Sequence, residues 1–306
     1  MKRALRLATR GSDLALAQTR EVARRLREAW PALVVHEEII RTTGDQNLEA
    51  ELAKIGAGDK GLFTKELEEA LLSGHSDAAV HSLKDLPTML PAGLRLGAIL
   101  PRADPGDVLV TAAPGGLSAL AAGAKVGTGS PRRQSMLRAE RPDVLAALIR
   151  GNVPTRLGKL AAGDYDAIIV AAAGLGRLGW NACGPIEVGG KTLHASPLEK
   201  FLPAPGQGAI AVEVREDDES TMELLASLHD QATAAAVQAE RAVLAGLGGG
   251  CHMALGARAV LEGGTLHLEA VVFDHDGQPS KHAALSGDAA DPEALGRAVA
   301  AKLHGD

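Results

Sequence analysis

The cysteine Cys251 stands at the end of a glycine run and is the first candidate for chemistry in this sequence. It follows residues 246–250, Gly-Leu-Gly-Gly-Gly, and Cys183 is the one other cysteine of the chain. Glycines leave little side-chain bulk beside the sulfur, so a large group could reach it. A thiolate is a strong nucleophile and a stable attachment atom. The alternative is a small apolar side chain in a turn, and the neighbouring residues alone do not decide between the two.

An aspartate, Asp85, is the second candidate. It follows Lys84 directly after residues 77–83, an apolar stretch typical of a buried strand. Nearby arginines would keep this carboxylate ionised at neutral pH. It could then stabilise a cation formed during a reaction or transfer a proton, and the alternative is a structural cap. His81, in the same stretch, is interpreted as an interior residue rather than a catalytic one.

Six arginines form the third candidate group, because each lies where a predicted strand gives way to a helix. Ligands of parallel sheets bind beyond the carboxyl ends of the strands, and helix N-termini there attract anions. Arginine binds carboxylates through two hydrogen bonds and stays charged. The chain has no phosphate loop of the ATP-binding type, so the pattern favours a ligand with several carboxylates. The six are Arg10, Arg132, Arg133, Arg150, Arg156 and Arg177.

Composition limits the classes of protein that can carry these residues. With 306 residues the chain can form two or three domains. A net charge of −6 and an aromatic content of 2% argue against a general nucleic-acid or membrane-surface binder. Two cysteines cannot form a disulfide framework, and no Cys/His spacing matches a zinc site, so no metal is expected. Without an apolar signal core or a membrane-length apolar run, the chain is expected to be cytoplasmic.

The order of the predicted elements indicates an α/β fold. Strands alternate with helices through residue 217, which predicts largely parallel, doubly wound sheets. The strands are predicted at residues 5–9, 34–41, 77–83, 94–100, 107–111, 125–128, 144–149, 166–171 and 209–214. Three further strands, at 255–261, 266–273 and 281–287, precede a helix at 292–303 and predict a small C-terminal α+β domain.

Seven short stretches carry a resemblance to a known family, and they occur in the family's order along nearly the whole chain. They are ATRGS at 8–12, KGLFTKELE at 60–68, AVHSLKDLP at 79–87, GTGSPRRQ at 127–134, RGNVPTRL at 150–157, PGQGA at 205–209 and GGC at 249–251. Together they resemble the porphobilinogen deaminase, or hydroxymethylbilane synthase, family. The sequence departs from the common pattern at Gly129, Pro131, Pro154 and residues 252–254, none of which removes a charged or nucleophilic group.

The resemblance implies three domains. Residues 1–100 with 201–217 would form the first, with the catalytic aspartate and a lid loop, and residues 101–200 the second, with the arginine-rich junctions. Both would be similar to the halves of a periplasmic binding protein, with doubly wound sheets. Residues 218–306 would form a small α+β domain that carries the cysteine.

The resemblance also implies the activity. Members of the family are transferases of porphyrin and heme biosynthesis that join four porphobilinogen molecules head to tail with loss of ammonia. The chain grows on a covalent dipyrromethane cofactor, and hydrolysis releases hydroxymethylbilane. By the resemblance, a thioether to Cys251 would hold the dipyrromethane, and the protein would be a monomer. From the composition, neither nucleic acid nor a membrane is expected as a partner.

Site residues follow by matching position to position. Asp85 would be catalytic, stabilising the cation that forms when ammonia leaves. The cofactor carboxylates would be held by Lys84, Ser130, Arg132 and Arg133. The substrate or the growing chain would be bound by Arg10, Ser12, Gln18, Phe63, Arg150, Arg156 and Arg177. Residues 54–61 would form, with Phe63, a lid.

Two other functions remain open at this point. A non-catalytic binding protein for a polycarboxylate small molecule would account for the arginines, but not for Cys251 or the Lys84-Asp85 pair. A different transferase could use Cys251 as a transient nucleophile. The mass of the intact protein separates all three, because only the deaminase carries a permanent adduct of two pyrrole units.

Overall fold

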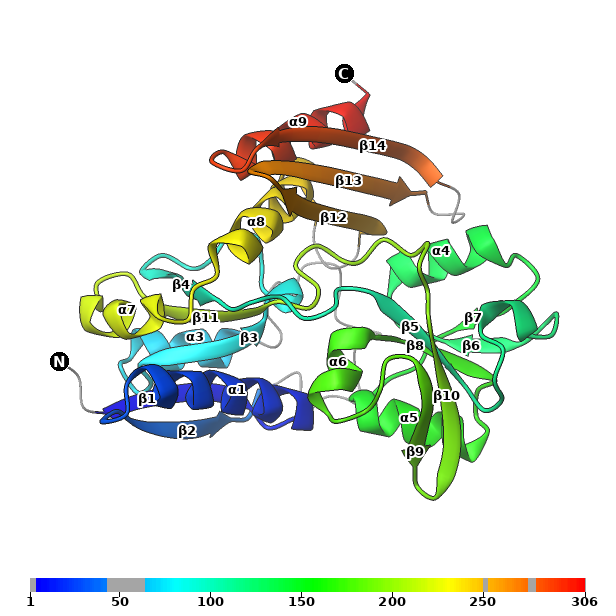
Figure 1. The fold of residues 1–306 in the computed structure, drawn as a ribbon, viewed down its shortest axis with the longest axis horizontal. Coiled ribbons are helices and arrows are strands. Elements are labelled where there is room, and N and C mark those ends of the chain that lie inside the picture. Colours follow the sequence, from blue (N-terminus) through cyan, green and yellow to red (C-terminus); the bar gives the residue numbers. More distant parts are fainter. Residues whose placement is uncertain (1–3, 43–63, 250–252, 275–278, 306) are drawn as a thin grey trace. The chain divides into compact units, whose positions relative to one another are not determined.

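The computed structural model divides the chain into two compact units, whose elements are shown in Figure 1. It describes residues 4–42, 64–249, 253–274 and 279–305. Unit 1 comprises Met1–Arg102 and Ala209–Ala234, and unit 2 comprises Ala103–Gly208 and Ala235–Asp306.

The described part of unit 1 contains a five-stranded sheet with helices on both faces. Its order is β2-β1-β3-β11-β4, with β1 parallel to β2 and β3, and β11 antiparallel to β3 and β4. Leu26 of one helix packs with Val80 and Val212 on one face, while Leu67 of another packs with Ala8 and Ala79 on the opposite face. The strands are β1 (Ala4–Arg10), β2 (Val34–Ile40), β3 (Ala78–Ser82), β4 (Leu94–Ile99) and β11 (Ile210–Arg215), and the helices are α1 (Asp13–Ala29), α3 (Lys65–Leu72) and α7 (Glu219–Ala226).

Unit 2 contains a six-stranded sheet within its described residues, in the order β7-β6-β8-β5-β10-β9. Here β6 is parallel to β7 and β8, whereas β5, β10 and β9 follow as antiparallel neighbours. Leu137 of α4 packs on one face and Leu157 of α5 on the other. The elements are β5 (Asp107–Thr111), β6 (Lys125–Gly127), α4 (Pro131–Glu140), β7 (Leu145–Ala147), α5 (Val153–Ala162), β8 (Ala167–Ala171), α6 (Ala172–Arg177), β9 (Gly184–Val188) and β10 (Lys191–Pro197).

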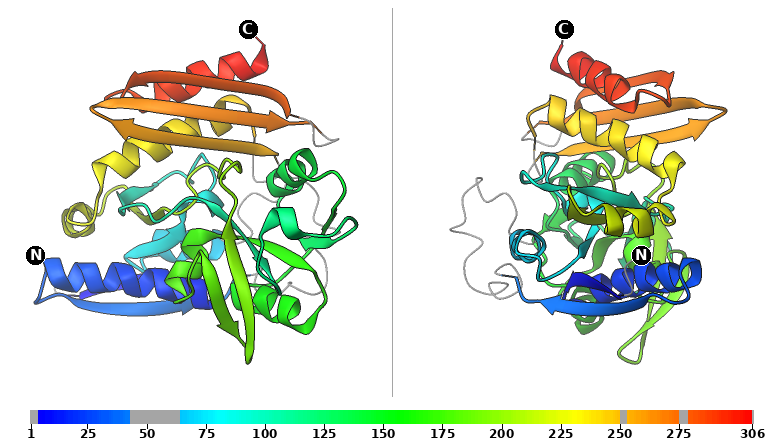
Figure 2. Two further views of the ribbon diagram at one scale, coloured as in Figure 1. Left: turned by 45° about the vertical axis from the view of Figure 1, so that its right-hand side comes forward. Right: turned by 90° about the vertical axis from the view of Figure 1, so that its left-hand side faces the viewer.

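A small antiparallel sheet, β12-β13-β14, completes unit 2, and Figure 2 shows it with its two helices. Residues of both helices, including Ala239 and Val299, share one apolar core with the sheet. Where the helices meet, a Cβ on Gly296 would collide with Ala239 O and Ala242 Cβ, so only glycine fits this close approach. The elements are α8 (Gln231–Gly246), β12 (Leu255–Glu262), β13 (Thr265–Phe273), β14 (Pro279–Asp288) and α9 (Pro292–His304).

These elements confirm the predicted α/β class and the small C-terminal α+β part. The pairing is more mixed than the largely parallel sheets predicted, because β5 and β11 run against the neighbouring strand β8 or β3. The hairpin of β9 and β10, which turns at Gly189 and Gly190, was not predicted. Helix α7, expected in the third domain, packs against β4 and β11 in unit 1. The division into three domains stays a prediction.

Within the described residues, no helix is both long and apolar enough to cross a lipid bilayer.

Replacing Gly296 by alanine should lower the free energy of unfolding of unit 2 by about 1–3 kcal/mol, because the added methyl group overpacks the contact between α8 and α9. Urea unfolding followed by circular dichroism measures this change. Gly158→Ala is the matched control, because its Cβ would meet open space in α5, and it should leave stability unchanged or raise it by about 0.5–1 kcal/mol. Equal effects of the two substitutions would contradict the packing argument.

Candidate active site

Unit 1 presents its predicted site residues at the carboxyl ends of two adjacent parallel strands. β1 ends at Arg10, and β3 leads into a 3-10 turn at Leu83–Asp85. Leu83 and Leu86 are buried, and the N–H of Leu86 donates to the Leu83 carbonyl (3.2 Å). Because these leucines anchor the turn, Lys84 stays partly exposed and Asp85 is exposed. The strand pairing therefore brings Arg10, Lys84 and Asp85 to one edge of the sheet.

The first turns of α1 supply two further predicted residues. Ser12 caps the helix, and its Oγ accepts a hydrogen bond from the N–H of Ala15 (3.4 Å). Gln18 is buried, and its Nε2 donates to Ser82 Oγ at 2.9 Å. The amide of Gln18 thus ties α1 to the last residue of β3, directly before the turn that carries Asp85.

His81 is an interior residue, as predicted. Its Nε2 lies 3.1 Å from Oε2 of Glu213, and the two side chains are 5% and 0% exposed. On the same face of the sheet, burial raises the pKa of Glu68, and the negative charge of Glu213 adds to the effect. These groups belong to the interior of unit 1 and not to its exposed edge.

In unit 2, Arg132 and Arg133 lie in the first turn of α4 and are 3% and 6% exposed. Both bind Asp107, the first residue of β5. Arg132 Nη1 donates to Asp107 Oδ2 at 2.6 Å, and Arg133 Nη2 donates to Oδ1 at 2.7 Å. Arg132 Nη1 also reaches the carbonyl of Leu202 (2.6 Å), and Arg133 Nη1 reaches that of Ile169 (3.0 Å). The arginine pair is therefore built into the interior of the unit.

This cluster carries an excess of positive charge. Burial alone would raise the pKa of Asp107, but the charges and hydrogen bonds of Arg133 and Arg132 outweigh it and hold that pKa well below its usual value. Asp107 is therefore ionised at neutral pH, and two guanidiniums face one carboxylate. Nε of Arg132 is buried without a hydrogen-bond partner among the described residues. Such a cluster favours a further anion nearby.

Two of the predicted helix N-termini in unit 2 are capped by side chains. Ser130 Oγ accepts a hydrogen bond from the N–H of Arg133 (3.4 Å), and Asn152 Oδ1 accepts one from the N–H of Thr155 (2.9 Å). Their strands, β6 and β7, are parallel neighbours, and the N–H of Thr128 donates to Ala147 O at 2.8 Å. The N-termini of α4 and α5 therefore follow adjacent strand ends.

The other arginines of unit 2 differ in position. Arg150 and Arg156 flank the cap of α5 and are partly buried, and Arg156 Nε donates to Gly151 O at 2.7 Å. Arg177 is the last residue of α6, not a residue of a helix N-terminus as predicted, and its Nη2 donates to Gly208 O at 2.9 Å. Residues 174–179 have the glycine spacing of a dinucleotide-binding turn, but α6 begins before them, at Ala172.

Three predicted features lie outside the described residues: Cys251, Phe63 and the loop at 54–61.

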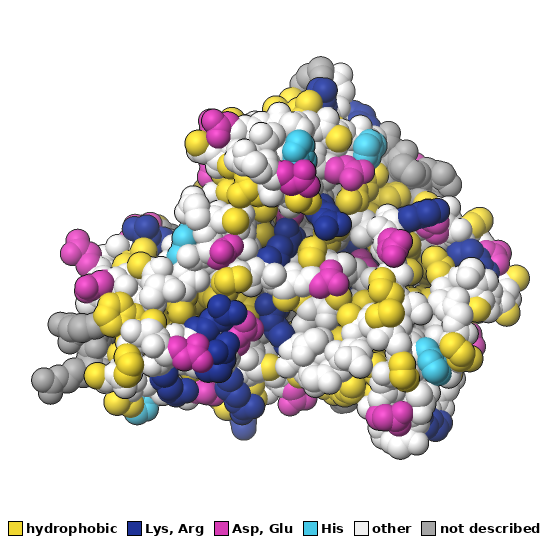
Figure 3. All heavy atoms as spheres, viewed as in Figure 1, with side chains coloured by type: hydrophobic (Ala, Val, Ile, Leu, Met, Phe, Trp, Pro, Cys, Tyr) yellow, Lys and Arg dark blue, Asp and Glu magenta, His cyan; other side chains and the backbone are white. Residues whose placement is uncertain are grey.

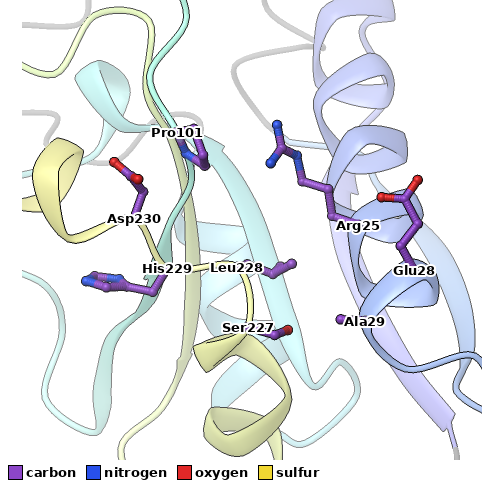
Figure 4. Close-up of a pocket in the computed structure, with 8 residues that line it drawn as sticks. All are labelled: Arg25, Glu28, Ala29, Pro101, Ser227, Leu228, His229 and Asp230. Atoms are coloured by element: carbon purple, nitrogen blue, oxygen red, sulfur yellow. The ribbon is translucent and has the colours of Figure 1, made fainter.

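Two cavities lie away from the predicted site. In unit 1 a hollow of about 300 Å³ is lined by Arg25 and Glu28 of α1 and by the segment that carries His229 and Asp230, and Figure 4 shows its lining residues. Two of its polar side chains form hydrogen bonds within the unit. Asp230 Oδ1 accepts a hydrogen bond from the N–H of Thr233 (2.7 Å), and His229 Nδ1 accepts one from the N–H of Ile99 (3.3 Å). A cavity of about 600 Å³ in unit 2 includes Thr111 and Leu193 in its lining. No predicted site residue within the described ranges lines either cavity.

The face in Figure 3 shows Lys and Arg side chains gathered over α1. On this helix Arg24 pairs with Glu28 (2.6 Å) and Arg25 pairs with Glu21 (3.1 Å). Pairs of this kind, four residues apart, are typical of a solvated helix face, so this basic surface is not taken as part of the site.

Two family models match the chain in succession. Residues 5–223 match "Porphobilinogen deaminase, dipyromethane cofactor binding domain", and residues 234–305 match "Porphobilinogen deaminase, C-terminal domain". The chain belongs to the porphobilinogen deaminase family. A porphobilinogen deaminase of Syntrophobacter fumaroxidans is 48% identical over 98% of this chain and 94% of its own length. That of Deinococcus radiodurans is 44% identical over 98% of this chain and 95% of its own length.

Among solved structures, the VFT2 domain of Bordetella pertussis BvgS has a TM-score of 0.42 and 17% identity, over 74% of this chain and 86% of its own. This likeness is too weak to support an inference. The family membership is sufficient for the function: the chain is a transferase of porphyrin biosynthesis, with dipyrromethane as its cofactor. A non-catalytic binding protein is not favoured.

The described residues fit such a cofactor. A dipyrromethane made from porphobilinogen carries acetate and propionate groups, which need cationic and N–H donors. The Arg132–Arg133 pair has a net positive charge, a buried Nε without a hydrogen-bond partner among the described residues, and the N-terminus of α4 beside it. These features are what a polycarboxylate requires.

Sequence reasoning missed Asp107 and Gln207, which both bind the arginine pair. Gln207 Nε2 donates to Asp107 Oδ1 at 2.8 Å. The one available signal was an aspartate at the start of the apolar strand at 107–111, since a charge that enters a core must be paired. Nothing local to Gln207 indicates its partner, which lies a hundred positions earlier.

Asp107→Asn should lower the free energy of unfolding at neutral pH by about 3–5 kcal/mol, because it leaves two buried guanidiniums without a counter-charge. Urea unfolding of both proteins measures the difference.

The difference should also depend on pH. The pKa of Asp107 is lower in the folded than in the unfolded chain, so its stabilisation is complete above the unfolded value of about 3.9 and is lost as the pH falls towards the folded value. The gap between wild type and Asp107→Asn should therefore be constant from about pH 7 to pH 5 and shrink below about pH 4. A gap that widens on acidification would contradict the assignment.

Proposed function

We propose that the chain joins porphobilinogen units on a dipyrromethane tethered to Cys251, with Asp85 as the catalytic carboxylate. The observation that carries the proposal is the strand pairing of unit 1, which presents Arg10, Lys84 and Asp85 at one sheet edge. A binding protein needs cations at such an edge, but it has no need of an exposed carboxylate beside them.

The arginines and Lys84 bind carboxylates in this proposal. Each pyrrole ring adds an acetate and a propionate, so the growing chain needs more cationic donors than one substrate would. Lys84, Ser130, Arg132 and Arg133 hold the carboxylates of the dipyrromethane. Incoming porphobilinogen and the growing chain are bound by Arg10, Ser12, Gln18, Phe63, Arg150, Arg156 and Arg177. When bound, the dipyrromethane supplies the free pyrrole carbon to which the first substrate is joined.

Asp85 acts on the substrate. Departure of ammonia from the aminomethyl group leaves positive charge on the substrate's pyrrole ring, and a carboxylate close to this ring lowers the energy of that cation. The same oxygens accept hydrogen bonds from pyrrole N–H groups and orient the ring for attack. Asp85 suits this role because its turn is fixed by Leu83 and Leu86 while its side chain is exposed.

We further propose that the protein acts as a cytoplasmic monomer of three domains and has no nucleic-acid partner.

Asp85→Asn should lower kcat by about a hundredfold or more, because the amide keeps the shape but loses the charge that stabilises the cation. Formation of hydroxymethylbilane from porphobilinogen measures the rate. Asp217→Asn, an exposed aspartate in the turn after β11, is the matched control and should keep the wild-type rate. Near-normal turnover of the Asp85 variant would refute its role.

Cys251→Ala should remove a covalent mass of two pyrrole units from the intact protein, because the proposed thioether forms on the sulfur of Cys251. Cys183→Ala is the control, since this thiol is exposed and lies outside the glycine run. Mass spectrometry of the intact proteins should show the adduct in wild type and Cys183→Ala alone. An unmodified wild-type protein that is inactive with porphobilinogen would overturn the tethered-cofactor proposal.

A further inference from the structure

The loop at 205–208 contains a buried amide whose two ends are both engaged. Gln207 is 1% exposed, and its Nε2 donates to Asp107 Oδ1 (2.8 Å) and to the carbonyl of Pro105 (2.7 Å). Its Oε1 accepts from Nη2 of Arg133 at 3.5 Å. An amide supplies both a donor and an acceptor, whereas a carboxylate here would repel Asp107. Gln207 therefore restrains both partners in the charge cluster.

The same loop is held from the other side by a carboxylate of α8. Glu240 is fully buried. Its Oε2 accepts a hydrogen bond from the N–H of Gly206 (2.8 Å), and its Oε1 accepts one from the N–H of Ala259 in β12 (2.8 Å). A buried carboxylate that accepts backbone N–H groups fixes them in place, because losing such a bond leaves a buried polar group unsatisfied. Glu240 thus fastens α8 to the residue next to Gln207 and to the small sheet.

These contacts form one continuous buried series within unit 2. It runs from Glu240 through Gly206 and Gln207 to Asp107, and from there to Arg132 and Arg133. Helix α8 ends at Gly246, and the glycine run from there leads to Cys251. A group that is covalently attached at a sulfur and bound at its carboxylates is held in one position only if the two attachment points keep a fixed distance and orientation.

We propose that Gln207 and Glu240 are positioning residues for the dipyrromethane. They hold the arginine pair and α8, the helix that leads to Cys251, in a fixed position relative to each other. The inference rests on the proposed function, in which Cys251 tethers the cofactor and Arg132 and Arg133 hold it. Neither residue contacts substrate. Gln207 acts through Asp107, and Glu240 acts through the backbone at Gly206 and Ala259.

The test compares full-length Gln207→Met and Glu240→Gln with wild type. Methionine keeps the length of Gln207 but removes its side-chain hydrogen bonds, and glutamine keeps the shape of Glu240 but turns one acceptor into a donor. The fraction of chains with the adduct is measured by intact mass, and kcat and KM for porphobilinogen are expressed per adduct-bearing chain. Gln238→Ala, an exposed residue of α8, is the control and should match wild type in all three values.

In both variants, a smaller fraction of chains should carry the adduct, and kcat per adduct-bearing chain should be lower by about tenfold or more. KM should stay within about twofold of wild type, because a misplaced anchor slows the reaction without altering the contacts that bind the substrate. Wild-type loading and kcat, with only a lower melting temperature, would mean that the network is purely structural and would overturn the inference.

A further variant covers the case in which Gln207→Met prevents folding. Gln207→Asn keeps donor and acceptor on a shorter side chain, and the inference expects it to fold and to show the same fall in kcat per loaded chain; a normal kcat would refute the inference. A wild type without any adduct would instead overturn the proposed function, so the two failures are distinguishable.

Discussion

The central constraint on unit 2 is the burial of two guanidiniums against one carboxylate. Arg132 and Arg133 follow one another at the start of α4, and their charges could not enter the interior without Asp107. The pairing fixes the first turn of α4 to the first residue of β5, and this turn also carries the cap Ser130. The helix N-terminus, the excess positive charge and the buried Nε of Arg132 therefore come together as a consequence of one ionic contact.

Unit 1 positions its charged residues by a different kind of force. Lys84 and Asp85 are placed by the burial of Leu83 and Leu86 on either side of them, so apolar packing holds the turn while the charges stay outside. Its internal polar contacts, such as that between Gln18 and Ser82, brace the same strand end. In both units, charged residues therefore follow the carboxyl ends of parallel strands.

Local signals predicted the α/β class and the helix N-termini well. Ser12, Ser130 and Asn152 cap helices in the structure because capping depends on residues within a single turn. The direction of the strands was harder to predict from the sequence. The antiparallel pairing of β11 with β3 joins segments that lie far apart in the chain, and no local pattern encodes this pairing. The same holds for Asp107, Gln207 and Glu240, whose partners are fixed by the tertiary fold. Arg177 was predicted at the junction between a strand and the helix that follows it, whereas α6 begins at Ala172 and Arg177 is its last residue.

The most direct test of the whole account is to follow the mass of the intact protein while it consumes limiting porphobilinogen. The account predicts a ladder of species above the resting protein, each heavier by one porphobilinogen less ammonia, that ends after four additions and returns to the resting mass as product is released. Consumption of porphobilinogen with no change in the mass of the protein at any time would contradict it.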